Sequence, residues 1–287
     1  METLFSDIFL PVTLAVITMG MGLSLTEKDF KNIFIQPKAI ITGIFSQIIV
    51  LPAIAFLVAS ITQLDPVFKV GLVIIAACPG GATSNLITYL LTGNIALSIS
   101  MTALNSLITL ITIPVIVSMA LELFISQGAN IHLPIGETVL KIFLLTIVPA
   151  YTGTRIRKWK TEFADKLQRP LKIILPLLLL IVYMGVIFID QGTEEATRRD
   201  FISLFPSTLS LNFAAMLSGW LIANLVRLGK RNRFTIAIEV GLQNSALAIF
   251  VASSLLKNQS MALVAVVYGS FTFFTTLLFG WIIKKIS

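Results

Sequence analysis

The sequence predicts an all-α membrane protein that crosses the bilayer with about nine helices. Of its 287 residues, 56% are hydrophobic and 12% are charged, whereas a soluble domain carries about 25% charged residues. The apolar residues form runs of roughly 20, the length that spans a hydrocarbon core of about 30 Å. The basic residues gather between these runs. Lipid is therefore the expected solvent of the chain.

Nine apolar stretches, separated by charged or Pro/Gly-containing turns, are candidate spans. They cover about 8–25, 38–61, 67–92, 94–122, 135–154, 170–189, 201–227, 232–256 and 259–284. Glu2 and Asp7 precede or begin the first stretch, where a signal peptide would have basic residues. We therefore expect the first stretch to be a retained transmembrane helix.

The distribution of basic residues predicts the orientation in the membrane, because Lys and Arg accumulate in cytoplasmic loops. With nine spans, 16 of the 21 basic residues fall on one side, at 28–38, 155–172, 227–233 and 284–285. We expect this side to be cytoplasmic, with the N-terminus outside and the C-terminus inside. The compact chain favours a bacterial inner membrane. Because orientation explains the net charge of +7, we do not expect nucleic acid as a partner.

Few residues are available for enzymatic or transition-metal chemistry. Cys78 is the only cysteine and His132, in a predicted outer loop, is the only histidine. These exclude multi-cysteine and paired-histidine zinc sites. No aspartate lies in the middle of a predicted span, so a pair of intramembrane aspartates is excluded too. The sequence therefore does not predict an enzyme.

The third stretch contains a Pro-Gly-Gly sequence near its centre. Pro79 removes a backbone donor, and Gly80 and Gly81 loosen the helix, so we expect a break near the bilayer midplane. A half-helix that begins near Ala82 would direct its free N–H groups at an anion. Side-chain oxygens follow in the Ser84–Asn85 pair. The alternative is a proline kink with structural hydrogen bonds between helices.

The eighth stretch contains Glu239, the only acidic residue well inside a predicted span. A carboxylate at this depth is costly unless it meets a cation or takes up a proton. Gly241 and the polar segment 243–245 predict a second interruption just after it. The alternative is a protonated glutamate with a structural role.

The fourth stretch carries a polar stripe whose members are spaced by four, three, four and three residues, which places them on one helix face. They are Ser98, Thr102, Asn105, Thr109 and Thr112. Such a stripe also packs helices together in lipid, as does an isolated amide such as Gln47 in the second stretch. Structural and functional interpretations both remain open for these residues.

The two interrupted stretches are third and eighth of nine, and paired broken helices point to a transport site near the midplane. We expect one transporter domain over residues 1–287. Its first repeat covers about 8–122 and its second about 170–286, with a connecting helix at 135–154 and a basic linker at 155–169. Four spans and one connector invert the second repeat, in which helix 8 corresponds to helix 3.

Four motifs make this chain resemble the bile acid:sodium symporter family, whose bacterial members carry small organic anions as well as bile acids. They are Gly20-Met-Gly-Leu-Ser-Leu, Cys78-Pro-Gly-Gly-Ala-Thr-Ser-Asn, Thr92-Gly-Asn-Ile-Ala-Leu-Ser and Glu239-Val-Gly-Leu-Gln-Asn-Ser. The resemblance covers most of the chain. It implies a sodium-coupled symporter of a small organic anion, such as a bile acid, a pantoate-like acid or a 2-oxo acid, working by alternating access.

The resemblance also implies two sodium ions at the crossing of the broken helices. The first would be held by Ser84, Asn85, Ser98, Thr102 and Glu239. The second would be held by Gln47, Glu239, Gln243 and the carbonyls of Val240 and Leu242. The anion would lie against Ala82, Thr83 and Asn244. The helices would be broken by Pro79, Gly80, Gly81 and Gly241.

Two departures from the family pattern leave the substrate open. Some bacterial relatives have ten spans, and we expect this chain to lack their first. Some relatives carry a His-Asn pair in the last span, where this chain has Ser270-Phe-Thr-Phe-Phe-Thr-Thr. The main rival function is a proton-coupled carrier or exporter of the same fold. A channel is disfavoured because no ring of polar residues recurs in several spans.

Overall fold

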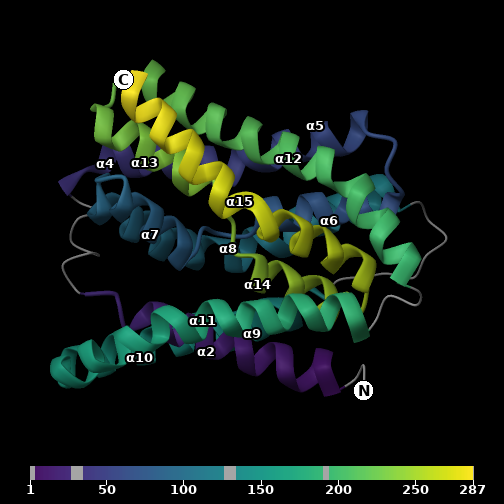
Figure 1. The fold of residues 1–287 in the computed structure, drawn as a ribbon, viewed down its shortest axis with the longest axis horizontal. Coiled ribbons are helices and arrows are strands. Elements are labelled where there is room, and N and C mark those ends of the chain that lie inside the picture. Colours follow the sequence, from purple (N-terminus) through teal and green to yellow (C-terminus); the bar gives the residue numbers. More distant parts are fainter. Residues whose placement is uncertain (1–3, 27–34, 126–133, 190–193, 287) are drawn as a thin grey trace.

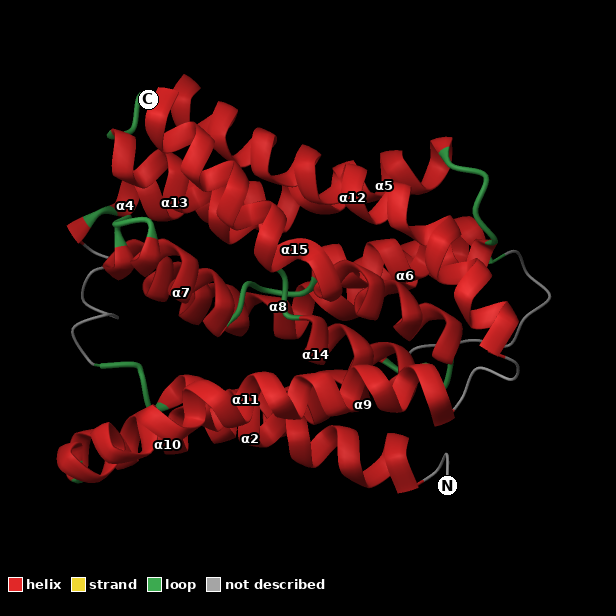
Figure 2. Ribbon diagram, in the orientation of Figure 1, coloured by secondary structure: helices red, strands yellow, loops and turns green. Residues whose placement is uncertain are grey.

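The computed structural model of this chain describes residues 4–26, 35–125, 134–189 and 194–286. Figure 2 shows these residues as helices joined by loops, and none of them lies in a strand. Seven of the described helices are long and apolar enough to cross a membrane, and two sharply bent pairs bring the number to nine. The predicted all-α membrane fold is confirmed.

The first four spans contain several short segments. They are η1 and α2 (Phe5–Phe9 and Leu10–Gly22), then α4, η2 and α5 (Pro37–Phe45, Ser46–Val50 and Leu51–Ile61), then α6 and α7 (Pro66–Ala77 and Ala82–Leu90), and then α8 (Ile95–Phe124). The η segments are π-helical turns within longer helices.

The remaining five spans follow the same pattern of long helices with local interruptions. They are α9, η3 and α10 (Ile135–Ile142, Phe143–Ile147 and Val148–Trp159), α11 (Thr161–Ile189), α12 (Glu194–Leu225), α13, α14 and η4 (Lys230–Gly241, Ser245–Ile249 and Phe250–Leu255), and α15 (Gln259–Ile286). The two chain ends lie at opposite ends of the molecule in Figure 1.

The basic segment 155–169 is helical, which corrects the prediction of a linker there. The connecting helix α10 continues to Trp159 and α11 already begins at Thr161, so only Lys160 separates them. Lys, Arg, Glu and Gln are good helix formers, and their long side chains carry the charge away from the apolar stem. The basic residues of this segment therefore lie in helices and not in a loop.

The helices form two layers, of which the smaller is the lower one in Figure 1. In this smaller layer α2 packs against α10, η3 and α11, and α10 packs against α11. The larger layer contains the other spans, with α6 packed against α5, α8 and α15, and α12 against α13 and α15. The layers touch where α8 meets α9 and η3, where α11 meets α15, and where α2 meets η4.

The interrupted spans lie at the centre of the larger layer. The apolar window of the eighth span, Lys230–Leu255, is 100% buried, against 33% for the fourth span, Ile95–Phe124. Residues 70–78 of the third span are also buried. Outer helices instead expose large apolar side chains, as Ile111 of α8 does, which suits contact with lipid tails. The broken backbone is thus enclosed by protein.

Two glycines allow the closest approach in the smaller layer. A Cβ atom on Gly22 of α2 would lie 2.1 Å from the carbonyl oxygen of Ala150, and one on Gly153 of α10 would lie 2.3 Å from that of Met19. Helices in lipid associate through such small residues, which let backbones touch. We infer that this contact holds α2 and α10 together as one rigid unit.

We predict that Gly153→Ala lowers thermal stability in detergent, because the added methyl group meets backbone atoms that cannot rotate away. Overpacking of this kind costs about 1–3 kcal/mol. Gly136→Ala in α9 is the matched control, since a Cβ there has nothing within 4 Å. Equal melting temperatures for the two variants would contradict the close contact.

Candidate functional site

The third span is broken at residues 78–81, between α6 and α7, and its two halves meet at an angle of 61°. Gly81 has an extended backbone and precedes the first residue of α7. Two carbonyl groups of the break accept hydrogen bonds from distant residues. That of Pro79 accepts a hydrogen bond from the backbone N–H of Asn244, at 2.8 Å. That of Cys78 accepts one from the Gln47 amide, at 3.3 Å.

The eighth span is interrupted at residues 242–244, where Leu242 has an extended backbone. Gly241, which was predicted to break the helix, is the last residue of α13, directly before the interruption. Its lack of a side chain serves packing, because a Cβ atom there would lie 2.3 Å from Cγ of Met216. The polar segment after Gly241 therefore forms the interruption. Since Asn244 also bonds Pro79, the two interruptions are in direct contact.

Side chains also bond backbone groups at the second interruption. The Gly241 carbonyl accepts hydrogen bonds from the Asn212 amide at 2.8 Å and from the Tyr268 hydroxyl at 2.7 Å. Asn244 begins α14, and its side-chain oxygen accepts a hydrogen bond from the N–H of Leu247 at 3.1 Å. Side chains thus replace the helical bonds that are lost at the break.

Glu239 is fully buried, with 0% of its surface exposed. Three hydroxyl groups donate hydrogen bonds to its carboxylate. Ser84 does so at 2.8 Å, Ser98 makes a short bond to the same oxygen, and Thr102 reaches the other oxygen at 3.1 Å. The side chain sits over Gly80, where a Cβ atom would lie 2.5 Å from Oε2 of Glu239. α7, α8 and α13 therefore meet at one carboxylate.

Asn85 belongs to the same cluster, because its side-chain oxygen lies 2.7 Å from the Ser98 hydroxyl oxygen and shares the single Ser98 proton with Glu239. The cluster is made of oxygen ligands with one ionisable group. Oxygen ligands suit hard cations. The described residues contain no group of three or more His, Cys, Asp or Glu side chains that could hold a metal ion, and His132 lies outside them. The donor set therefore fits an alkali cation better than a transition metal.

A second oxygen-rich group lies beside Glu239. Gln47 of η2 donates a hydrogen bond to the side-chain oxygen of Gln243 at 2.6 Å, and Gln243 donates one to the carbonyl of Val240 at 2.7 Å. The side-chain oxygen of Gln47 is buried and has no hydrogen-bond partner. The Leu242 carbonyl lies near Gly80. The residues expected for a second ion therefore lie close together, and the side-chain oxygen of Gln47 has no partner.

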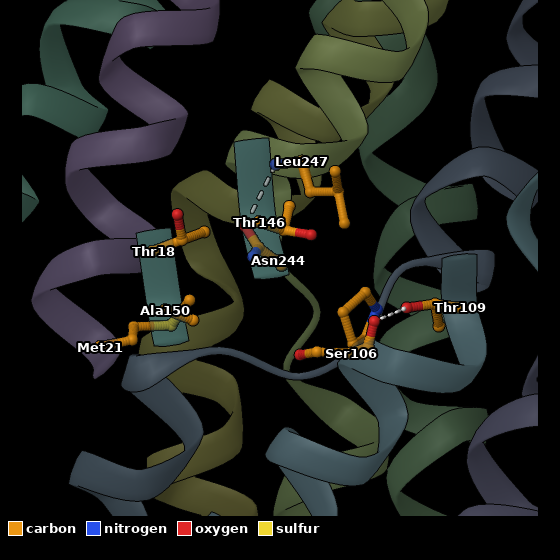
Figure 3. A pocket seen from close by; sticks show the side chains of 9 residues that line it. Thr18, Met21, Ser106, Thr109, Thr146, Ala150, Asn244 and Leu247 are labelled. Carbon is orange, nitrogen blue, oxygen red and sulfur yellow. Dashed lines mark hydrogen bonds between the residues drawn. The ribbon is translucent and has the colours of Figure 1, made fainter. Parts of the chain in front are cut away.

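A small cavity lies between the two layers, next to the breaks (Figure 3). It has a volume of about 30 Å³, which is room for roughly two water molecules. The smaller layer contributes Thr18, Met21, Thr146 and Ala150, and the larger layer contributes Pro79, Ser106, Thr109, Asn244 and Leu247. Its polar groups are hydroxyls and one amide.

The residues expected to contact the anion separate into two places. Asn244 lines the cavity, whereas Ala82 and Thr83 are exposed at the start of α7. Sequence reasoning missed most of the cavity residues. Thr109 belonged to the polar stripe of α8, but Thr146 and Ala150 lie in an apolar stretch that carries no polar pattern. Only the packing of the layers reveals them.

The polar stripe of α8 contains one amide without a partner. Asn105 is fully buried, and neither of its side-chain polar atoms has a hydrogen bond. A buried unpaired polar group costs about 1–3 kcal/mol. Asn212 is equally buried, but its amide donates to the Gly241 carbonyl and its oxygen accepts from Thr275. The two asparagines are therefore equally buried, but only the side chain of Asn212 has hydrogen-bond partners.

We predict that Asn105→Leu raises the thermal unfolding temperature, because it removes an unpaired amide and keeps the branching and the number of heavy atoms of the side chain. Asn212→Leu is the matched control and should lower that temperature, since it leaves the Gly241 carbonyl short of a donor. Scanning calorimetry in detergent measures both. A loss of stability in Asn105→Leu as large as in Asn212→Leu would contradict this prediction.

Comparisons with known proteins give a consistent result. A sequence model described as the Sodium Bile acid symporter family matches residues 11–195. The chain is 28% identical over 248 residues to the "Uncharacterized sodium-dependent transporter YocS" of Bacillus subtilis (strain 168), covering 86% of this chain and 74% of that protein. It is also 28% identical to the "Probable sodium/metabolite cotransporter BASS1, chloroplastic" of Arabidopsis thaliana, covering 86% of this chain and 59% of that protein.

A mammalian relative, the "Sodium/bile acid cotransporter 4" of Mus musculus, is 28% identical over 243 residues. That alignment covers 83% of this chain and 54% of the mouse protein. The chain thus spans less than two thirds of the plant and mouse relatives. All three names describe transporters that use sodium.

Proposed function

The chain belongs to the sodium bile acid symporter family, and from that premise we propose that it couples sodium entry to uptake of a small organic anion by alternating access. The family consists of sodium-dependent transporters, and its activity is transport rather than enzymatic catalysis. The observation that carries the proposal is the convergence of three hydroxyl groups on the buried carboxylate of Glu239.

The first sodium ion would bind the Glu239 carboxylate in place of the three hydrogen bonds from these hydroxyl groups. The hydroxyl groups would keep their protons and turn their oxygens toward the ion. Its ligands would be oxygens of Ser84, Asn85, Ser98, Thr102 and Glu239. Ser98 and Thr102 are one turn apart on α8 and face the same carboxylate, so a cation between them requires rotation of hydroxyl groups and little backbone movement. Preorganisation of this kind favours binding because few groups must be ordered.

The second sodium ion would use Gln47, Glu239, Gln243 and the carbonyls of Val240 and Leu242. The unpartnered oxygen of Gln47 supports this assignment, because a bound cation would stabilise a buried oxygen that has no hydrogen-bond donor. Glu239 would be shared and offset part of the charge of both ions. Two sodium ions with a monoanion move one net positive charge inward, and a membrane potential contributes about 2.3 kcal/mol per charge per 100 mV.

The anion would lie at the boundary of the two layers, against Asn244 and the start of α7. Ala82 and Thr83 are exposed there, and the first N–H groups of a helix attract negative charge. The hydroxyl-rich cavity at Asn244 suits a compact carboxylate such as a pantoate-like or 2-oxo acid. A bile acid remains a candidate that the same test includes.

The size of the cavity supports a movement between the two layers. A cavity of about 30 Å³ has room for roughly two water molecules, so the layers would have to part to admit one of these anions. The smaller layer would move as a unit against the larger layer, which holds both ion sites. The proposal includes a single domain with inverted repeats at about 8–122 and 170–286, joined through the fifth span.

The proposed setting is a bacterial inner membrane, with the N-terminus outside and the C-terminus in the cytoplasm. The described termini lie at opposite ends of the molecule, as an odd number of spans requires. The partners would be the lipid bilayer and a small organic anion.

A proton-coupled carrier or exporter is the second candidate, and it is favoured by one observation. Each of the three side chains that contact the Glu239 carboxylate is a neutral hydroxyl group. A protonated glutamate would also fit these partners. The two candidates differ in whether sodium or pH controls anion binding.

We predict that purified wild-type protein binds a small carboxylate in sodium and not in potassium at the same ionic strength. The panel contains pantoate, a 2-oxo acid and taurocholate, and calorimetric titration measures binding. Glu239→Gln keeps the shape of the side chain and removes its charge, so binding in sodium should be lost. Binding that is equal in both salts and follows pH would instead establish the proton-coupled carrier.

We predict that Thr146→Phe abolishes anion binding and preserves the rise in melting temperature that sodium causes. The new ring would fill the cavity from the smaller layer, whereas the ion ligands lie in the larger layer. Thr152→Phe is the matched control, since Thr152 is exposed on α10. Loss of the sodium effect in Thr146→Phe would show that the two sites are not separate.

A further inference from the structure

The turn between α7 and α8, residues 92–94, is pressed against α13 at the cytoplasmic end of the proposed topology. Thr92 has a φ of 60°, a strained value for a β-branched residue. A Cβ atom on Gly93 would lie 2.7 Å from a methyl carbon of Thr88 and 2.8 Å from the hydroxyl oxygen of Thr235. Only a glycine therefore allows this approach. The proposed ion sites use none of these residues.

Asn94 ends the turn and uses its whole side chain to join three helices. Its oxygen accepts a hydrogen bond from the N–H of Leu97 at 3.1 Å, which caps α8. Its amide nitrogen donates to the side-chain oxygens of Gln36, before α4, and of Asn232, on α13, at 2.8 Å each. Its backbone N–H donates to the hydroxyl of Thr235 on α13 at 3.0 Å.

Thr235 is held in one orientation. It is fully buried, and its hydroxyl donates to the carbonyl of Arg231 at 2.7 Å. The hydroxyl proton is thereby directed away from Asn94, and the oxygen is free to accept the Asn94 N–H. The contact between α8 and α13 at this level is therefore defined by specific bonds and not by apolar packing alone.

The register connects this contact to the candidate sodium site. Asn94 lies four residues before Ser98 on α8, and Thr235 lies four residues before Glu239 on α13. Four residues correspond to about one helical turn, or 6 Å. The pair Asn94–Thr235 and the pair Ser98–Glu239 are thus successive contacts between the same two helices.

We propose that Asn94 and Thr235 are positioning residues that set the separation of Ser98 and Glu239 and thereby the affinity for sodium. This inference rests on the proposed function, because it needs a sodium ion at Glu239. Neither residue touches the ion. Each acts by fixing α8 against α13 one turn away, as an outer-shell residue orients a metal ligand.

The test is the sodium concentration that gives half of the maximal rise in melting temperature, measured on the purified full chain at constant ionic strength. Thr235→Val keeps the shape and removes the acceptor for Asn94. Its half-saturating concentration should rise about 10-fold, the usual effect of losing an outer-shell partner. Thr235→Ser keeps the hydroxyl group, so its half-saturating sodium concentration should be close to that of the wild type.

Asn94→Asp supplies a second variant if Thr235→Val folds poorly. Aspartate keeps the cap of α8 and removes the two bonds that the amide donates, so half-saturation should again shift upward. Lys284→Met is the matched control. It removes a hydrogen bond from Lys284 to Thr92, in the same turn, outside the Asn94–Thr235 contact, and should leave half-saturation unchanged.

The outcomes separate this inference from the function on which it rests. Ser98→Ala is the reference, since it removes a proposed ligand. If wild type responds to sodium and Ser98→Ala does not, an unchanged half-saturation in Thr235→Val and Asn94→Asp overturns the positioning role, even when both melt earlier. If wild type does not respond to sodium, the proposed function fails and the inference fails with it.

Discussion

The burial of one carboxylate in the middle of the membrane domain is the constraint on which the rest of this structure depends. Glu239 has no exposed surface, and a charge at such depth is costly unless specific partners surround it. Its partners come from α7 and α8, so these helices must reach α13 at one point. Gly80 completes the site because any side chain there would collide with the carboxylate.

The polar groups that surround Glu239 come partly from helices that are broken near it. Such breaks must be enclosed by protein. A backbone group that is freed in lipid has no water to bond. Here the Pro79 carbonyl bonds Asn244, and the Gly241 carbonyl bonds Asn212 and Tyr268. The complete burial of the eighth span's apolar window follows from the same requirement. The two interruptions thus satisfy each other while they bring polar groups to Glu239.

The sequence was sufficient for features that carry a strong local signal. Hydropathy gave the spans, Pro79 and its glycines gave the first break, and Glu239 stood out because few acidic residues lie in lipid. The resemblance supplied Asn85 and Gln243 as ligands, and in the structure Asn85 bonds Ser98 whereas Gln243 bonds Gln47. Spacing alone did not show that two helices distant in sequence meet at this carboxylate.

Other features depended on long-range packing or on weak local preferences. The cavity residues Thr146 and Ala150 lie in an ordinary apolar stretch, and only the contact between the layers gives them a role. The segment 155–169 was predicted to be a linker because of its many basic residues. The helix propensity of the same residues was the better guide to its structure. Gly241 ends α13 and lies against Met216, where a Cβ atom would collide with that side chain, and composition cannot reveal this contact.

The most direct test of the central claim is equilibrium binding of radioactive sodium to the purified protein and to Glu239→Gln. We expect saturable binding to the wild type, near two ions per chain, and none above background to the variant at the same concentrations. A variant that binds sodium as the wild type does would contradict a coupling site at Glu239, whatever its effect on transport.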